Sequence, residues 1–280
     1  MSLRGLRLAT QFLTRLPVPG VVDFSPADLS RAGPWFPFVG AIIGALVATV
    51  MIVTRLLLAD GGNALLTGVL GVVAWAWITG ALHLDGLGDL ADALAASHRD
   101  PQRFLSVLSD PHLGTFGVVS IVFAILMKTA ALSAAPGYSI AALALVAAWA
   151  RLGPLGWSRW LKPLKPGSGE RFAWSPGLGW IACWTVVLLA ASAVAAPILC
   201  IAPLVLLAWG IWLKVRLGGM TGDCLGAGVE VTEVALLLIL ALAARLFRDE
   251  HGWLNQAVAA VCEQVFLVTA GLPLRLKPGG

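Results

Sequence analysis

The sequence predicts an all-α membrane protein, a polytopic bundle of transmembrane helices that forms one domain over residues 1–280. Hydrophobic residues make up 59% of the chain and charged residues only 12%, and the mean hydropathy is +0.87, which lies outside the range of water-soluble globular domains. Several apolar runs reach the length of about 20 residues that a helix needs to cross the hydrocarbon core. The runs are continuous rather than alternating, which excludes a transmembrane β-barrel.

The first 33 residues predict an interfacial segment on the membrane surface. Four leucines share one side of a possible helix, with arginines nearby: Leu3, Leu6, Leu13 and Leu16. Pro17 and Pro19 end this helix. Because the arginines interrupt the apolar residues before a signal-peptide core develops, we expect the first span to be retained.

Eight apolar runs follow and predict the spans. They lie at roughly 35–58, 64–83, 115–134, 139–157, 176–195, 198–213, 230–247 and 254–272. Pro197 and Pro203 could instead turn 176–213 into one broken hairpin, and the last run contains Asn255, Glu263 and Gln264. The expected number of spans is therefore six to eight.

The basic residues predict the orientation of the bundle, since Lys and Arg prefer the cytoplasmic side of short loops. With the N-terminus inside, an eight-span topology places Arg55, Arg245 and Arg248 outside. It places the following basic residues in the cytoplasm: Arg4, Arg7, Arg15, Arg31, Arg99, Arg103, Arg151, Arg159, Lys162, Lys165, Arg171, Lys214, Arg216, Arg275 and Lys277. We therefore expect a multi-pass protein of the inner membrane whose polar segments face the cytoplasm.

The most acidic segment follows directly on the second apolar run. Its carboxylates, Asp85, Asp89 and Asp92, are separated by four and three residues, and His83 precedes them. On a helix this spacing places all three on one face. Carboxylates so close together repel one another, which is costly near a membrane unless a cation is bound. Mg²⁺ is the expected cation, because it prefers carboxylate, water and phosphate oxygens.

A second polar segment ends the same predicted loop, 84–114, and opens the next span. Asp110 adds a carboxylate, and His112 could act as a base or bind an anion. Gly114 and Gly117 flank Thr115 and allow main-chain N–H groups to approach a phosphate at a helix start.

A third polar segment, the predicted loop 214–229, contains Thr221, Gly222 and Asp223, and Glu230 and Glu233 follow at the start of the next span. The alternative for each segment is a solvated loop in which Asp caps a helix and Gly serves a turn. Three such segments on one membrane face, in a chain with 15 acidic residues, favour a metal-phosphate site.

Other polar residues carry weaker signals. Lys128 lies about four turns into a span and should face the bundle interior and a carboxylate. The basic residues from Arg159 to Arg171 could contact phosphate or simply hold the topology. The cysteines form no CxxC pattern and are interpreted as small apolar residues, without a zinc site or disulfide framework: Cys183, Cys200, Cys224 and Cys262.

At these segments the chain resembles the cobalamin synthase family. Five ordered stretches carry the resemblance: Phe12–Pro19, Trp35–Gly40, His83–Leu87 with Asp89 and Asp92, Asp110–Gly117, and Thr221–Gly226 with Glu230 and Glu233. The family usually has Gly after the third Asp of the first acidic motif, where this chain has Ala93. From about Asp249 the chain departs from the family pattern, which leaves 249–280 as an atypical tail.

The resemblance implies a Mg²⁺-dependent phosphotransferase. In this family a ribose hydroxyl of α-ribazole, or of its 5′-phosphate, attacks the corrin-proximal phosphorus of adenosylcobinamide-GDP, and GMP leaves. The expected metal ligands are Asp85, Asp89, Asp92, Asp223, Glu230 and Glu233. The expected catalytic residues are those four aspartates with Asp110 and His83. Substrate binding is assigned to His112, Gly114, Thr115, Lys128, Arg151, Thr221 and Gly222.

Two other functions remain as alternatives. A CDP-alcohol phosphotransferase also uses Asp/Gly motifs, but its Asp-Gly stands three residues after an Asp and is followed by Ala-Arg. In the segment from Asp85 to Asp92 the Asp-Gly comes first and Ala-Arg is absent. An ion-coupled transporter would place charges near the bilayer midplane and show an internal repeat, and we find no repeat. The expected partners are the two small-molecule substrates and the lipid bilayer, without nucleic acid; a homo-oligomer or association with other cobalamin-assembly enzymes is possible.

Overall fold

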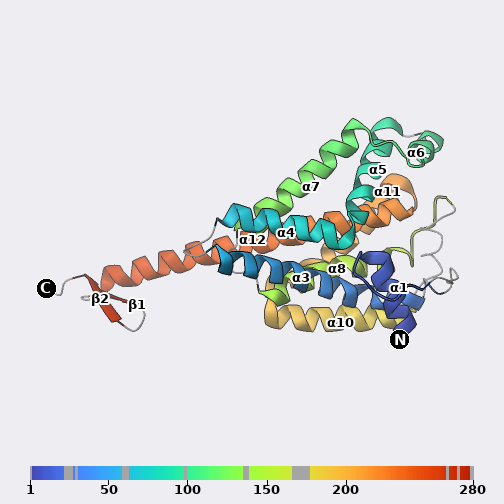
Figure 1. The fold of residues 1–280 in the computed structure, drawn as a ribbon. Helices are drawn as coiled ribbons and strands as arrows, with labels where there is room; N and C mark the ends of the chain where they lie inside the picture. The colour runs from blue at the N-terminus through green and yellow to red at the C-terminus, as the bar shows by residue number, and fades with distance from the viewer. Residues whose placement is uncertain are drawn as a thin grey trace.

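The computed structural model describes residues 2–21, 28, 31–58, 63–97, 100–134, 139–165, 177–262, 265–269 and 272–277. Across these residues the chain forms a bundle of helices, from which the C-terminal part of the last helix projects (Figure 1). The predicted all-α bundle is confirmed. Arg99 and Arg171, two of the basic residues used to orient the chain, lie outside the described residues.

The helices coincide closely with the predicted apolar runs over most of the chain. Their bounds are α1 Leu3–Leu13, η1 Gly33–Trp35, α3 Phe36–Leu57, α4 Ala64–Thr79, α5 Leu82–Ser97, α6 Pro101–Val107, α7 Thr115–Ala134, α8 Ile140–Trp157, α10 Leu178–Ala195, η2 Pro197–Ile201, α11 Ala202–Leu217 and α12 Gly222–Val261. The predicted loop 84–114 is thus largely helical, and much of 214–229 belongs to α11 and α12.

Six of the described helical segments are long and apolar enough to cross a membrane, and the bent pair of α4 and α5 makes a seventh when counted as one span. The pair bends by 90° at Gly80, which ends α4 in the left-handed conformation with φ 62°. Figure 1 shows α4 running along the bundle and α5 running across its end. We therefore treat α4 as the spanning helix and α5 as a helix at the membrane face.

Close packing of α3 against α8 forms the centre of the bundle. Gly40 and Gly44 face the backbone of α8, where a Cβ atom on Gly44 would lie 2.1 Å from the carbonyl oxygen of Leu143. Small residues four apart allow two transmembrane helices to approach this closely. Trp149, fully buried on α8, donates a hydrogen bond to the Ser192 hydroxyl of α10 at 3.0 Å.

The C-terminal tail differs from the prediction. The expected last span, 254–272, is wrong, because α12 continues without a break to Val261 and residues beyond it form an antiparallel hairpin of β1 (Val265–Thr269) and β2 (Leu272–Lys277). The β-branched residues of β1 favour a strand, and Pro273 disfavours a helix interior.

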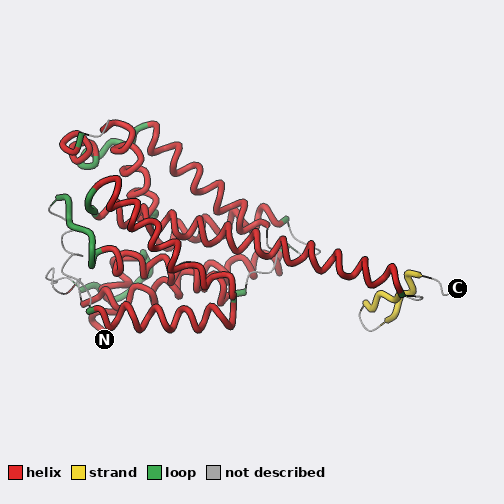
Figure 2. Tube along the Cα trace, turned by 180° about the vertical axis from the view of Figure 1, so that it is seen from behind, coloured by secondary structure: helices red, strands yellow, loops and turns green. Residues whose placement is uncertain are grey.

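Without that last span the tail cannot return to the side of the N-terminus. Figures 1 and 2 show α12 leaving the bundle at the end opposite the N-terminus. The placement of Arg275 and Lys277 with the N-terminal arginines is therefore also wrong.

Candidate functional site

Two helices cross closely where the first and third acidic segments meet. Gly86 of α5 lies against the start of α12, so a Cβ atom on it would lie 3.0 Å from the carbonyl oxygen and 3.3 Å from the Cα atom of Asp223. A Cβ atom on Gly226 would lie 3.8 Å from the Cα atom of Gly86. This contact brings Asp85 and Asp89, which flank Gly86 on α5, to Asp223 on α12.

The electrostatics of Asp89 show that these carboxylates act on one another. Partial burial, followed by the charges of Asp85, Asp223 and Asp92, raises the pKa of Asp89 to about 6, and the Lys165 ammonium opposes this shift. Asp85 is exposed, whereas Asp223 is half-buried. The cluster is therefore a concentration of negative charge at the end of the bundle, suited to a cation.

The turn between α11 and α12 positions Asp223. α11 ends at Gly218 with φ 74°, and the Thr221 side chain caps α12 by accepting from the Cys224 N–H at 3.3 Å. The Met220 N–H donates to the Lys162 carbonyl at 2.8 Å, and the Leu164 N–H donates to the Met220 carbonyl at 2.9 Å. These backbone bonds hold the basic segment after α8 beside the acidic turn.

Lys165 is the residue that connects the polar segments. Its Nζ lies 3.8 Å from an Asp223 carboxylate oxygen and donates to the Leu108 carbonyl at 3.2 Å and to the Ser109 hydroxyl at 3.3 Å. From the sequence, Lys165 is one of the basic residues that predict the orientation and one of several possible phosphate contacts. Its nearness to Asp223 is not revealed by spacing along the chain.

Asp92 lies on the same helix as Asp85 and Asp89 but has different partners. Its carboxylate accepts the Gly114 N–H at 2.6 Å and the Gly117 N–H at 2.9 Å. These are the N–H groups at the start of α7 that the sequence predicts to bind phosphate. Thr115 begins α7 beside them and is exposed. The geometry favours a capping role for Asp92, while its role as a metal ligand stays a prediction.

We expect Asp92→Asn to retain activity near that of the wild type and Asp92→Ala to lose stability by about 1 kcal/mol, because Asn still accepts N–H groups at a helix start and Ala does not. Thermal unfolding of both purified variants, with activity measured in parallel, checks this. If Asp92 were an essential metal ligand, Asn and Ala would be equally inactive.

Asp110 and His112 pair with each other at the surface. The Asp110 carboxylate accepts the His112 N–H at 3.0 Å and lies 2.6 Å from His112 Nδ1. These hydrogen bonds, the backbone bond first, lower the pKa of Asp110. The structure places the pair in the segment before α7, one residue beyond the Ser109 hydroxyl that Lys165 contacts.

A buried cluster of charges lies deeper in the bundle. Lys128 Nζ of α7 is 2.5 Å from a Glu230 oxygen and 2.5 Å from a Glu233 oxygen. Glu233 also pairs with Arg151 of α8 and accepts from Trp75 Nε1 of α4 at 3.1 Å. The prediction that Lys128 faces the interior and a carboxylate is confirmed. Glu230 and Glu233, predicted as metal ligands, are engaged here by cations.

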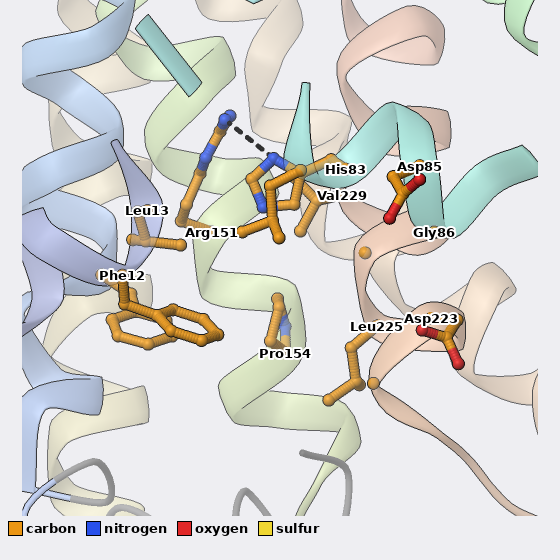
Figure 3. A pocket seen from close by; sticks show the side chains of 14 residues that line it. Phe12, Leu13, His83, Asp85, Gly86, Arg151, Pro154, Asp223, Leu225 and Val229 are labelled. Carbon is orange, nitrogen blue, oxygen red and sulfur yellow. Dashed lines mark hydrogen bonds between the residues drawn. The ribbon is translucent and has the colours of Figure 1, made fainter. Parts of the chain in front are cut away.

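A cavity of about 180 Å³ joins this cluster to the crossing of α5 and α12 (Figure 3). We call this crossing, with Asp85, Asp89 and Asp223, the acidic crossing. His83 and Arg151 line one end, with Arg151 Nη2 3.4 Å from His83 Nδ1, and Asp85 and Asp223 line one side. Burial, with the nearby cations Arg151 and Lys128, holds the pKa of His83 well below its usual value. The imidazole is therefore neutral at physiological pH.

The carboxylates at the crossing fit a Mg²⁺ ion that is completed by substrate. Among the described residues, no three His, Cys, Asp or Glu side chains form a ready metal shell. Mg²⁺ usually takes one or two carboxylates and fills its remaining positions with water and substrate phosphates. Burial and then the repulsion from neighbouring carboxylates raise the pKa of Asp89, and such a cation would relieve the repulsion.

Comparisons with known proteins place this arrangement in context. Residues 5–241 match the family model described as cobalamin-5-phosphate synthase. The chain is 48% identical over 250 residues to the adenosylcobinamide-GDP ribazoletransferase of Thiobacillus denitrificans, covering 88% of this chain and 98% of the relative. It is 31% identical over 255 residues to the protein of the same name from Corynebacterium efficiens, covering 85% of this chain and 91% of the relative.

The tail resembles a different family. Residues 232–276 match the model described as cobinamide kinase / cobinamide phosphate guanyltransferase, a stretch that includes the later part of α12 and nearly all of the hairpin. No solved structure matches the chain. The point near Asp249 where the chain departs from the cobalamin synthase pattern thus falls within the segment that is similar to the second family. This point lies in the part of α12 that is remote from the acidic crossing.

Proposed function

The chain belongs to the cobalamin-5-phosphate synthase family, and on this premise we propose that it joins adenosylcobinamide-GDP to α-ribazole, or to α-ribazole 5′-phosphate, with release of GMP. The observation that carries the proposal is the crossing of α5 and α12, where Asp85, Asp89 and Asp223 meet beside a cavity. A concentrated negative site at a bundle end suits a reaction between phosphate-bearing substrates that requires a divalent cation.

The proposed reaction is a displacement at the corrin-proximal phosphorus. A ribose hydroxyl oxygen forms a new P–O bond, the P–O bond to GMP breaks, and the hydroxyl proton passes to a base. One or two of the carboxylates of Asp85, Asp89 and Asp223 would hold Mg²⁺, which would supply charge neutralisation for the pyrophosphate and the departing GMP. Lys165, beside Asp223, would contact a phosphate oxygen and stabilise negative charge on the leaving group.

We assign the base to one of these carboxylates rather than to His83. Arg151 has only donor groups, so the contact between Arg151 Nη2 and His83 Nδ1 makes Nδ1 an acceptor. The proton of the neutral imidazole then lies on Nε2, which leaves no free acceptor on the ring. His83 is therefore suited to donate to a substrate oxygen or nitrogen.

We further propose that the acidic crossing faces the cytoplasm. Exposed cations lie at the same end of the bundle as α5, on α11 and on the segment after α8: Arg159, Lys162, Lys214 and Arg216. In a variant whose four native cysteines are replaced by alanine, a cysteine introduced at Ser109 should then resist an impermeant thiol reagent in intact spheroplasts, whereas one introduced at Asn63 should react. The opposite labelling pattern would reverse the orientation.

The test of the proposed function is GMP release by purified protein from adenosylcobinamide-GDP and α-ribazole, with Mg²⁺ or with EDTA. Release that requires both α-ribazole and Mg²⁺ is expected. A folded wild-type protein that releases no GMP but transfers a phosphoalcohol from a CDP-alcohol would replace the proposal with the lipid phosphotransferase. Substrate movement that depends on an ion gradient would replace it with the transporter.

Mg²⁺ binding is expected to weaken as the pH falls below about 6, by about tenfold per pH unit, because the proton taken up by Asp89 competes with the cation. The Mg²⁺ concentration that gives half-maximal GMP release, measured from pH 5 to 8, checks this. Asp89→Asn should remove the dependence in this range. A wild-type profile that is flat below pH 6 would contradict it.

A further inference from the structure

We infer that the cavity beside the acidic crossing is the binding site for the base of α-ribazole, and that helix α1 forms the wall that selects this base. The inference rests on the proposed function and goes beyond it by stating which part of which substrate the cavity holds.

The lining of the cavity has two chemistries. Apolar side chains from α1, α3, α5, α8 and α12 form most of the wall: Phe12, Leu13, Phe36, Leu82, Pro154, Leu225 and Val229. Asp85 and Asp223 lie on one side, and His83 and Arg151 lie at one end (Figure 3). Such a site fits a ligand with a flat apolar body and a polar group directed to the carboxylates.

The aromatic part of the wall is preformed. The rings of Phe12 and Phe36 stack with their centroids 5.9 Å apart and their planes inclined by 13°. Phe36 is buried at the start of α3, whereas Phe12 is half-buried on α1. An aromatic ligand gains from contact with such rings beyond the burial of its area.

The size of the cavity separates the two substrates. An engineered apolar cavity of about 150 Å³ accepts benzene, so about 180 Å³ suits a compact ring system. α-Ribazole carries a dimethylbenzimidazole, which is a flat apolar bicycle, on its ribose. A corrin macrocycle is far too large, and guanine would bury several polar edge groups against an apolar wall.

The polar end of the cavity matches the single acceptor on this base. Dimethylbenzimidazole, once joined to ribose, keeps one ring nitrogen with a free lone pair. Arg151 is fully buried, and its Nε–H has no hydrogen-bond partner among the residues that the structure describes. A buried donor without a partner is destabilising, and an acceptor on a bound ligand would remove that cost. With the base in this position, the ribose lies toward Asp85 and Asp223, where the attacking hydroxyl is required.

The experiment measures equilibrium binding of α-ribazole to the purified full-length protein in nanodiscs, separately from turnover. Val229→Trp places a large side chain in the cavity, and Val186→Trp makes the same change at an exposed position of α10. We expect Val229→Trp to weaken α-ribazole binding at least tenfold and Val186→Trp to leave it unchanged. The KM for adenosylcobinamide-GDP should stay within about twofold in both.

A second variant guards against misfolding of Val229→Trp. Leu225→Ala enlarges the same cavity and should shift the preference toward ribosides with bulkier bases, while Phe12→Ala should weaken α-ribazole binding about tenfold. Unchanged α-ribazole affinity in these variants would overturn the inference, as would a rise confined to the KM for adenosylcobinamide-GDP. Wild-type protein that binds α-ribazole in the cavity but never releases GMP would instead refute the proposed function alone.

Discussion

Asp223→Asn is expected to reduce GMP release by at least about 10²–10³-fold, with α-ribazole still bound, and Asp85→Asn is expected to do the same. Both carboxylates lie at the crossing of α5 and α12, where Mg²⁺ must offset the charge of the pyrophosphate as it is displaced. Loss of a single preorganised group at such a point typically lowers kcat by this amount. The measurement is single-turnover GMP release at saturating Mg²⁺.

The matched control is Asp100→Asn. Asp100 is an exposed aspartate whose carboxylate accepts the Gln102 N–H at 2.9 Å at the start of α6, and Asn serves equally well at that position. Its activity should equal that of the wild type. Equal, modest losses in all three variants would indicate a general effect of surface charge and would remove Asp85 and Asp223 from the reaction.

The sequence predicted the spans well because hydropathy and length determine membrane insertion. It placed 115–134 and 139–157 on the helices that the structure has there. Two features were beyond this reasoning. The 90° bend at Gly80 separates the spanning helix α4 from the surface helix α5, although the two together are apolar enough to be taken for one span. The run 254–272 combines the end of a helix with a strand, and its average hydropathy does not distinguish them.

The acidic crossing was predictable in part. The spacing of Asp85, Asp89 and Asp92 placed them on one helical face, but only the tertiary structure separates Asp92, which caps α7, from the two that meet α12. For Glu230 and Glu233 as well, the sequence alone does not identify the partner of the carboxylate. A carboxylate near a membrane requires a cation, and the sequence cannot state whether that cation is Mg²⁺ or a lysine from a distant helix. Lys128 and Arg151 provide it here.

Glu233→Leu is expected to be among the most destabilising single substitutions in the bundle, with a loss of about 3–5 kcal/mol, because it leaves Lys128 and Arg151 buried with one carboxylate fewer. Glu233 contacts side chains from α4, α7 and α8, so its removal loosens three helices at once. Thermal unfolding in detergent measures the effect, and Lys162→Met, which removes an exposed cation, is the control.

The double variant Lys128→Met with Glu233→Leu should recover part of the stability that Glu233→Leu alone loses. In Glu233→Leu the buried Lys128 ammonium keeps Glu230 but loses the second of the carboxylates that it contacts among the described residues, and the double variant removes this ammonium. This recovery separates a charge-balance role from a packing role, since a packing defect would deepen when a second buried side chain is changed. Recovered stability with weaker α-ribazole binding would further connect the cluster to the cavity, because Arg151 belongs to both. A double variant less stable than Glu233→Leu would show that the cluster acts through packing.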